Sequence, residues 1–206
     1  MYMIIRILDF IFSLALSILL IPIFITIAII IIISTGFPVF YVQSRVGMNE
    51  KIFPFVKFRT MTVNNSANNG DSNEYLSMNV DELKRIRSNY ITTKKDDSRI
   101  TRIGRFLRKS SFDELPQLWN VVVGDMSLVG PRPDPPIQKA DYLEKLWLER
   151  CQVKPGITGY AQIKGRSEST EEERISNDLF WVKNKSFNLY IKIILLTPIV
   201  LLKNTN

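Results

Sequence analysis

One apolar run near the N-terminus constrains the fold of this chain more than any other feature. No charged residue lies between Asp9 and Arg45, and residues 10–34 read FIFSLALSILLIPIFITIAIIIIIS. As an α-helix this run would measure about 37 Å, which is enough to cross a bilayer. It lacks the small-residue cleavage site of a secretory signal and is longer than the apolar region of one. We therefore predict that the segment is retained and lies in a membrane.

Pro22 stands at the centre of this run, where it removes a backbone hydrogen bond and kinks a helix. Two geometries fit the pattern. A kinked helix can cross the bilayer, because proline is tolerated in transmembrane helices. Alternatively, a re-entrant helix breaks at Pro22 and leaves by the face that it entered, since each half of about 18 Å is too short to span alone. Arg6 and Asp9 are three residues apart and could pair at the interface.

Composition limits the chemistry of the remaining chain. With 206 residues, the sequence has room for a membrane segment over residues 1–35 and one domain over residues 36–206. A net charge of +7 indicates an anionic partner, which can be nucleic acid, a phosphorylated metabolite or a lipid surface. The chain has no histidine, so any catalysis must use carboxylates, hydroxyls, lysines or the thiol of its single cysteine, Cys151. One cysteine excludes an intrachain disulfide.

Local patterns predict the elements of the domain. Residues 37–61 alternate apolar and polar positions around a turn at residues 47–50, which predicts a β-hairpin. Residues 63–73 form a polar loop, and helices are expected over residues 81–89, 142–151 and 170–184. The apolar run of about 14 residues after Tyr190 is too short to span, so we expect a helix that lies at the membrane surface or packs on the domain.

Two adjacent carboxylates, Asp113 and Glu114, precede Pro116 in the stretch SSFDELPQLWN. A structural interpretation makes Asp113 the N-cap of the following helix and pairs Ser111 with Glu114 in a capping box. A functional interpretation uses the same helix start, because a helix N-terminus attracts phosphate. One carboxylate would then face a phosphorus atom while the other holds Mg²⁺ on the same diphosphate. Spacing alone does not choose between these interpretations.

Basic residues in several motifs accompany the acidic pair. Each one taken singly fits a solvated surface charge, whereas together they fit phosphate binding. Arg132 stands between two prolines, which limits its backbone freedom. The spacing around Asp178 and Trp181 indicates only a helix-surface acid and a core aromatic. The candidate phosphate-binding residues are Arg108, Arg132, Lys57 and Arg59.

Taken together, these motifs resemble the small monotopic phosphoglycosyl transferases, which are bacterial sugar transferases. The resemblance rests on RILDF, the proline-broken apolar helix, KFRTM, the block DDSRITRIGRFLRKSSFDELPQLWNVVVGDMSLVGPRP, VKPGITGYAQIKGRS and NDLFW. It covers nearly the whole chain, and its central block is long and specific. It departs from the family pattern at Ile21, where serine commonly precedes the proline, and at Phe112, where leucine is usual.

The resemblance implies a transfer of phospho-sugar from a UDP-sugar to undecaprenyl phosphate at the cytoplasmic face of the bacterial inner membrane. Asp113 would attack the sugar-bearing phosphorus and form a covalent intermediate, Glu114 would be a ligand of a Mg²⁺ cofactor, and Asp178 would be a further acid of the active site. The basic residues would bind phosphates. The implied fold is a mixed α/β domain with a small β element and amphipathic interfacial helices, anchored by a re-entrant helix.

Two further functions compete with this one. A catalytically silent, membrane-tethered scaffold of a glycan assembly complex would be expected to lack the acidic pair, and both carboxylates are present. A membrane-anchored nucleic-acid binder would cluster basic and aromatic residues, whereas the basic residues here are spread through phosphate-type motifs. We therefore expect a UDP-sugar, undecaprenyl phosphate and membrane lipid as partners, and no nucleic acid. Self-association and the identity of the sugar stay open.

Overall fold

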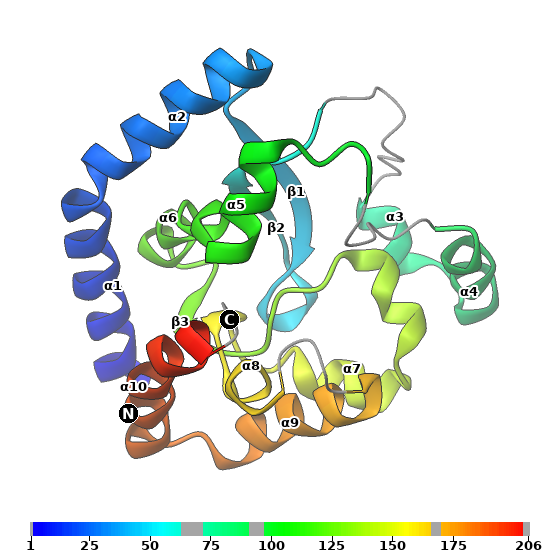
Figure 1. Cartoon of the computed structure of the whole chain (residues 1–206). Helices are drawn as coiled ribbons and strands as arrows, with labels where there is room; N and C mark the ends of the chain where they lie inside the picture. The colour runs from blue at the N-terminus through cyan, green and yellow to red at the C-terminus, as the bar shows by residue number, and fades with distance from the viewer. Residues whose placement is uncertain (1, 63–71, 91–96, 166–169, 204–206) are drawn as a thin grey trace.

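The protein is a helix-rich framework with two small β-sheets (Figure 1). The computed structural model describes residues 2–62, 72–90, 97–165 and 170–203. This architecture agrees with the mixed α/β class expected from the sequence. The elements in chain order are α1 (Tyr2–Leu19), α2 (Ile21–Thr35), β1 (Phe40–Val46), η1 (Met48–Glu50), β2 (Ile52–Phe58), α3 (Ser72–Ser77), α4 (Val80–Ser88), α5 (Arg102–Ser110), η2 (Phe112–Glu114), α6 (Gln117–Val123), β3 (Ser127–Val129), η3 (Pro136–Asp141), α7 (Glu144–Arg150), β4 (Gly156–Thr158), α8 (Tyr160–Lys164), α9 (Glu171–Asn184) and α10 (Phe187–Lys203).

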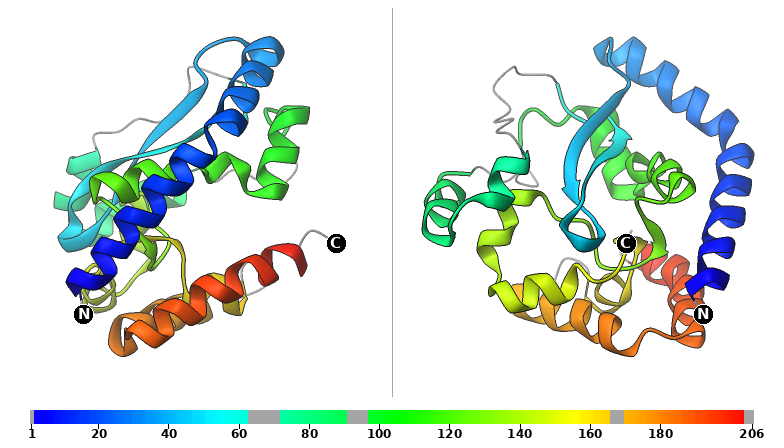
Figure 2. Two further views of the ribbon diagram at one scale, coloured as in Figure 1. Left: turned by 90° about the vertical axis from the view of Figure 1, so that its left-hand side faces the viewer. Right: turned by 180° about the vertical axis from the view of Figure 1, so that it is seen from behind.

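The apolar run forms two helices, α1 and α2, that meet at Leu20 with a bend of 58°. Pro22 lies in the first turn of α2, where its missing N–H costs the helix little, so the predicted break is confirmed. Among the described residues, no single helix is long and apolar enough to cross a bilayer, whereas the bent pair qualifies by length and composition. Figure 2 (right) shows the pair running along one side of the molecule, and the left view shows the same side from the front.

The expected pairing of Arg6 with Asp9 is wrong, because each side chain binds the domain instead. Arg6 donates hydrogen bonds to two carbonyl oxygens at the C-terminal end of α6. Asp9 is buried and accepts hydrogen bonds from the Ser127 hydroxyl (2.7 Å), the Leu128 amide (3.0 Å) and the Tyr190 hydroxyl (2.7 Å). These contacts fasten the first turns of α1 to β3 and α10.

Antiparallel strands β1 and β2 confirm the predicted hairpin, with Phe40 opposite Phe58 and Val46 opposite Ile52. Phe58 is fully buried against Ile27 and Ile31 of α2 and Leu107 of α5. The end of β2 therefore packs between α2 and α5. Such burial of apolar side chains contributes about 1.5–3 kcal/mol per side chain.

Strands β3 and β4 form a short parallel pair on which α10 packs through Tyr190 and Ile193. One face of α10 is thus packed on the domain, while Leu195 and Ile199 on its other side are 66% and 49% exposed. The helices predicted over residues 81–89 and 170–184 are confirmed as α4 and α9, and Thr170 forms a capping box at the start of α9. The helix expected over residues 142–151 is shorter and forms α7, and the loop at residues 63–73 lies mostly outside the described residues.

Candidate active site

A pocket of about 810 Å³ opens beside η2 and is bounded by α5, α6, α8, α9 and α10. The Pro-Arg-Pro loop after β3 and the end of β2 complete its walls. The pocket brings together six of the seven residues that the sequence nominated, although they are spread over more than 120 positions of the chain. These residues are Lys57, Arg108, Asp113, Glu114, Arg132 and Asp178.

A reversal of the chain at Ser111 sets the position of Asp113. Ser111 has a positive φ of 59°, which ends α5 and starts the single turn η2 that carries Asp113. Helix α6 begins only at Gln117, and its start receives no side-chain capping bond. The predicted N-cap and capping box are therefore wrong. The sequence interpretation placed Asp113 at the start of a continuous helix, whereas Pro116 separates η2 from α6.

Asp113 is only 6% exposed, and its carboxylate has no Lys or Arg nitrogen within 4 Å among the described residues. Burial and the neighbouring charge of Glu114 raise the pKa of Asp113 to about 6, although Lys57 and Arg108 oppose the increase. Burial likewise lowers the pKa of Lys57 to about 8. An unpaired, partly desolvated carboxylate that is still mostly ionised near neutral pH suits a nucleophile.

Glu114 points to Arg132 and forms a bidentate ion pair with it, in which Arg132 Nη1 lies 3.1 Å from Oε2 and Nη2 contacts Oε1. The two adjacent carboxylates thus differ in their partners. Arg132 lines the pocket, and its side chain remains 46% exposed. Its planar fork suits a phosphate group as well as a carboxylate.

Four consecutive carbonyl groups hold the Pro-Arg-Pro loop in place. Their oxygens accept hydrogen bonds from the Gly156 amide, Arg150 Nη2, Arg45 Nη1 and the Val46 amide, in that order, from residue 131 to residue 134. The two prolines lack N–H groups, so carbonyl contacts are the main means of fixing this backbone. The loop is therefore rigid where it presents Arg132.

Asp178 is buried and paired with Arg150, whose Nε lies 2.9 Å from its carboxylate. The expectation of an ordinary helix-surface acid is therefore wrong. Arg150 also contacts Asp134 at 3.3 Å, and Asp134 accepts a 2.6 Å hydrogen bond from the Tyr142 hydroxyl. Burial raises the pKa of Asp178 even though Arg150 opposes this. Asp178 borders the pocket, and its carboxylate is committed to the network that holds the loop.

Sequence reasoning missed Arg150 and Asp134. The available signal was weak: Asp134 directly follows the Pro-Arg-Pro motif, and Arg174 stands four residues before Asp178 on one face of α9. Neither pattern indicates that the side chains are buried. Only the packing of α7 against α9 makes Arg150 inaccessible to solvent.

The two remaining basic residues lie in different places. Arg108 is in the last turn of α5, borders the pocket and donates a 2.8 Å hydrogen bond to Thr60 Oγ1. Arg59 is buried outside the pocket, where it donates to the carbonyl oxygens of Thr35, Gly36 and Phe37 at the end of α2. A cation is favourable there because the last carbonyl groups of a helix carry partial negative charge. The structure therefore does not bring Arg59 into the candidate site.

Comparison with known proteins decides the family. The family model described as "Bacterial sugar transferase" matches residues 1–204. The chain belongs to the bacterial sugar transferase family.

Several curated members of this family are similar to the chain. "Uncharacterized sugar transferase EpsL" of Bacillus subtilis is 41% identical over 80% of the chain and 70% of the relative. "UDP-galactose-lipid carrier transferase" of Erwinia amylovora is 38% identical over 96% of the chain and 40% of the relative. "Undecaprenyl-phosphate galactose phosphotransferase" of Salmonella typhimurium is 39% identical over 82% of the chain and 34% of the relative. The chain thus spans well under half the length of the last two.

The acidic pair of this family member fits a magnesium ion that is shared with a substrate. Among the described residues, no group of three His, Cys, Asp or Glu side chains forms a metal cage. Mg²⁺ usually binds one or two carboxylates and takes its other ligands from substrate phosphates and water. Glu114, next to Asp113 at the wall of the pocket, carries hard carboxylate oxygens of the kind that Mg²⁺ prefers.

Proposed function

We propose that the chain transfers a sugar-1-phosphate from a UDP-sugar to undecaprenyl phosphate, giving undecaprenyl-diphosphate-sugar and UMP. One observation carries the proposal: Asp113, a buried carboxylate without an ion-pair partner among the described residues, lies among basic side chains in a pocket of about 810 Å³. Relatives named "UDP-glucose:undecaprenyl-phosphate glucose-1-phosphate transferase" in Xanthomonas campestris and Escherichia coli support the reaction class. Neither the sugar nor the pathway follows from these names.

In the first step, an Asp113 carboxylate oxygen attacks the β-phosphorus of the UDP-sugar. The bond between this phosphorus and the bridging oxygen breaks, and UMP leaves with the electron pair. In the second step, a phosphate oxygen of undecaprenyl phosphate attacks the same phosphorus and displaces the Asp113 carboxylate. With a pKa of about 6, Asp113 is ionised at neutral pH and needs no base to activate it.

The surrounding charges stabilise the negative oxygens of both steps. Arg132, held by its loop, and Arg108, at the end of α5, line the pocket and would contact the diphosphate, while Lys57 of β2 acts on Asp113 through its charge. Glu114 orients Arg132 and would be the metal ligand. Mg²⁺, when bound, supplies charge neutralisation at the transferring phosphate.

We further propose that α1 and α2 form a re-entrant anchor at the cytoplasmic face of the bacterial inner membrane. The 58° bend and the docking of both helices on one domain support this placement. A polyprenyl phosphate keeps its phosphate near the surface of the bilayer, so an anchor of this kind brings the pocket to the lipid substrate. Exposed apolar side chains on α5 and α6, such as Phe106 and Trp119, fit the same orientation.

Protein labelling tests the covalent step. Purified protein with Mg²⁺ is incubated with a panel of radiolabelled UDP-sugars without lipid acceptor, and protein-bound label is measured. We expect label from the correct sugar, its loss in Asp113→Asn, and its discharge when undecaprenyl phosphate is added. Asp81→Asn, which changes an exposed carboxylate on α4, is the control and should label as the wild type does. UMP release that requires lipid, with no labelled protein, would instead indicate direct transfer.

A further inference from the structure

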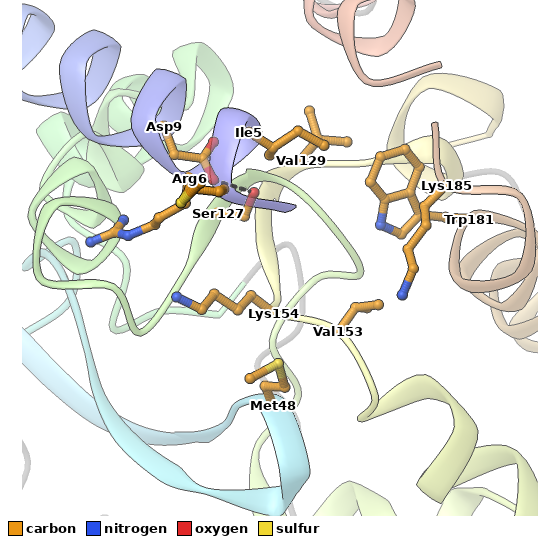
Figure 3. Close-up of a pocket in the computed structure, with 11 residues that line it drawn as sticks. Ile5, Arg6, Asp9, Met48, Ser127, Val129, Val153, Lys154, Trp181 and Lys185 are labelled. Carbon is orange, nitrogen blue, oxygen red and sulfur yellow. Dashed lines mark hydrogen bonds between the residues drawn. The ribbon is translucent and has the colours of Figure 1, made fainter. Parts of the chain in front are cut away.

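A second cavity of about 310 Å³ lies between α1, the tip of the β1–β2 hairpin, β3, the segment before β4, and the end of α9 (Figure 3). We call it the α1–α9 cavity. Its walls are mainly apolar, and Figure 3 shows Ile5, Val129, Val153 and Trp181 around it. Among the described residues, it shares no lining side chain with the active-site pocket.

Three cationic side chains line this apolar cavity, namely Arg6, Lys154 and Lys185. Arg6 and Lys154 converge beside Gly124, where a methyl carbon would lie 3.0 Å from Arg6 Nη2 and 3.6 Å from Lys154 Nζ. The two cationic groups are thus within reach of one small anion. Like charges placed this close repel each other, and bound anions relieve the repulsion.

Among the described residues, no carboxylate forms a direct ion pair with either of these two cations. Asp9, the carboxylate of the cavity wall, already accepts three hydrogen bonds from neutral donors. Arg6 donates to neutral carbonyl oxygens, and within the described chain neither Arg6 nor Lys154 has an Asp or Glu oxygen within 4 Å. Burial and the charge of Arg6 lower the pKa of Lys154, although the charges of Asp9 and Asp125 oppose this shift.

The position of the cavity identifies the kind of anion. The charge-free run of α1 begins directly after Asp9, so Arg6 and Asp9 mark the level at which the anchor helix leaves the apolar layer. The side of the same helix that faces away from the cavity is apolar and exposed at Ile4 and Ile7. A cavity that combines cations with apolar walls at this level matches a phosphate headgroup together with part of an acyl chain.

We propose that the α1–α9 cavity binds an anionic phospholipid that is not a substrate of the transfer reaction. The phosphate lies between Arg6 and Lys154, and an acyl chain occupies the apolar space beside Trp181. Because Asp9 and Ser127 join α1 to β3 in the same wall, the bound lipid also stabilises the docking of the anchor on the domain.

Lipid retention tests this proposal. Purified full-length protein in a non-ionic detergent is mixed with dioleoyl phosphatidylglycerol or dioleoyl phosphatidylcholine, and native mass spectrometry measures the bound lipid. We expect selective retention of phosphatidylglycerol and about fivefold weaker binding in Lys154→Gln, as each basic residue near a lipid phosphate contributes about 1 kcal/mol. Lys154→Arg should retain binding, and Lys84→Gln, on the exposed face of α4, is the matched control.

A second measurement locates the acyl chain. Phosphatidylglycerol with brominated acyl chains should quench part of the tryptophan fluorescence, and Trp181→Phe should remove that part. Circular dichroism verifies that each variant is folded. Equal retention of the two lipids, equal losses in Lys154→Gln and Lys84→Gln, or displacement by inorganic phosphate at equal concentration would overturn the proposal. If Arg108→Gln loses the lipid and Lys154→Gln retains it, the lipid binds in the active-site pocket, which would also overturn the proposal.

Discussion

Replacement of Asp113 by asparagine should stabilise the protein while it abolishes the proposed chemistry. Burial raises the pKa of this carboxyl from 3.8 to about 6. A difference of about 2 in pKa corresponds to about 3 kcal/mol. The free energy of unfolding is lower by this amount at neutral pH, because the folded protein keeps a buried carboxylate ionised. The buried amide of asparagine is also desolvated, so the net gain in Asp113→Asn should be about 1–3 kcal/mol.

The pH dependence of this gain has a defined sign. Below about pH 4 the carboxyl is protonated in both the folded and the unfolded state, so wild type and Asp113→Asn should differ little. Between about pH 4 and pH 6 the unfolded state loses its proton first, and the stability of the wild type falls relative to the variant. Above about pH 6 the difference should be complete and constant.

Thermal unfolding in detergent at several pH values measures the effect. For a chain of this size, about 1 kcal/mol corresponds to a shift in Tm of about 2–4 °C, so Asp113→Asn should melt several degrees above the wild type at neutral pH. Asp81→Asn removes an exposed carboxylate from the first turn of α4 and should lower stability by less than about 1 kcal/mol. A variant less stable than the wild type at neutral pH, or a difference that does not change between about pH 4 and pH 7, would refute the reasoning.

Two other substitutions test the contacts that position the Pro-Arg-Pro loop and α1. Arg150→Met should lower the free energy of unfolding by about 3–5 kcal/mol, because it leaves Asp134 and Asp178 as buried carboxylates with one cation fewer. Because Arg150 holds the carbonyl group of Arg132, Arg150→Met should also lower the kcat of transfer measured as UMP release. Arg150→Lys should restore part of this kcat. Full activity of folded Arg150→Met would contradict a positioning role for Arg150. Asp9→Leu should leave the Ser127 and Tyr190 hydroxyls and the Leu128 amide without their acceptor, at a cost of about 2–4 kcal/mol. Limited proteolysis should then cleave between α1 and the domain faster than in Ser17→Ala, whose side chain makes no hydrogen bond to the domain in the described structure.

Much of the fold follows from local sequence patterns. Pro22 breaks the apolar run, period-two alternation marks the hairpin, and Thr170 with Glu173 marks the start of α9. Each of these signals acts within a few residues, through backbone geometry or a nearby hydrogen bond, so the sequence displays it directly. The motif around Asp113 and Glu114 likewise placed most of the candidate site.

The tertiary structure alone decided which charges work together. Arg59 and Arg132 are chemically alike, yet Arg59 binds carbonyl groups at the C-terminal end of α2 and Arg132 lines the pocket. Arg6 and Asp9 bind groups more than 110 positions away rather than each other. The burial that raises the pKa of Asp113 also comes from segments distant in the chain. The partners and the solvation of a charged side chain depend on packing between such segments, and local patterns of sequence carry no record of that packing.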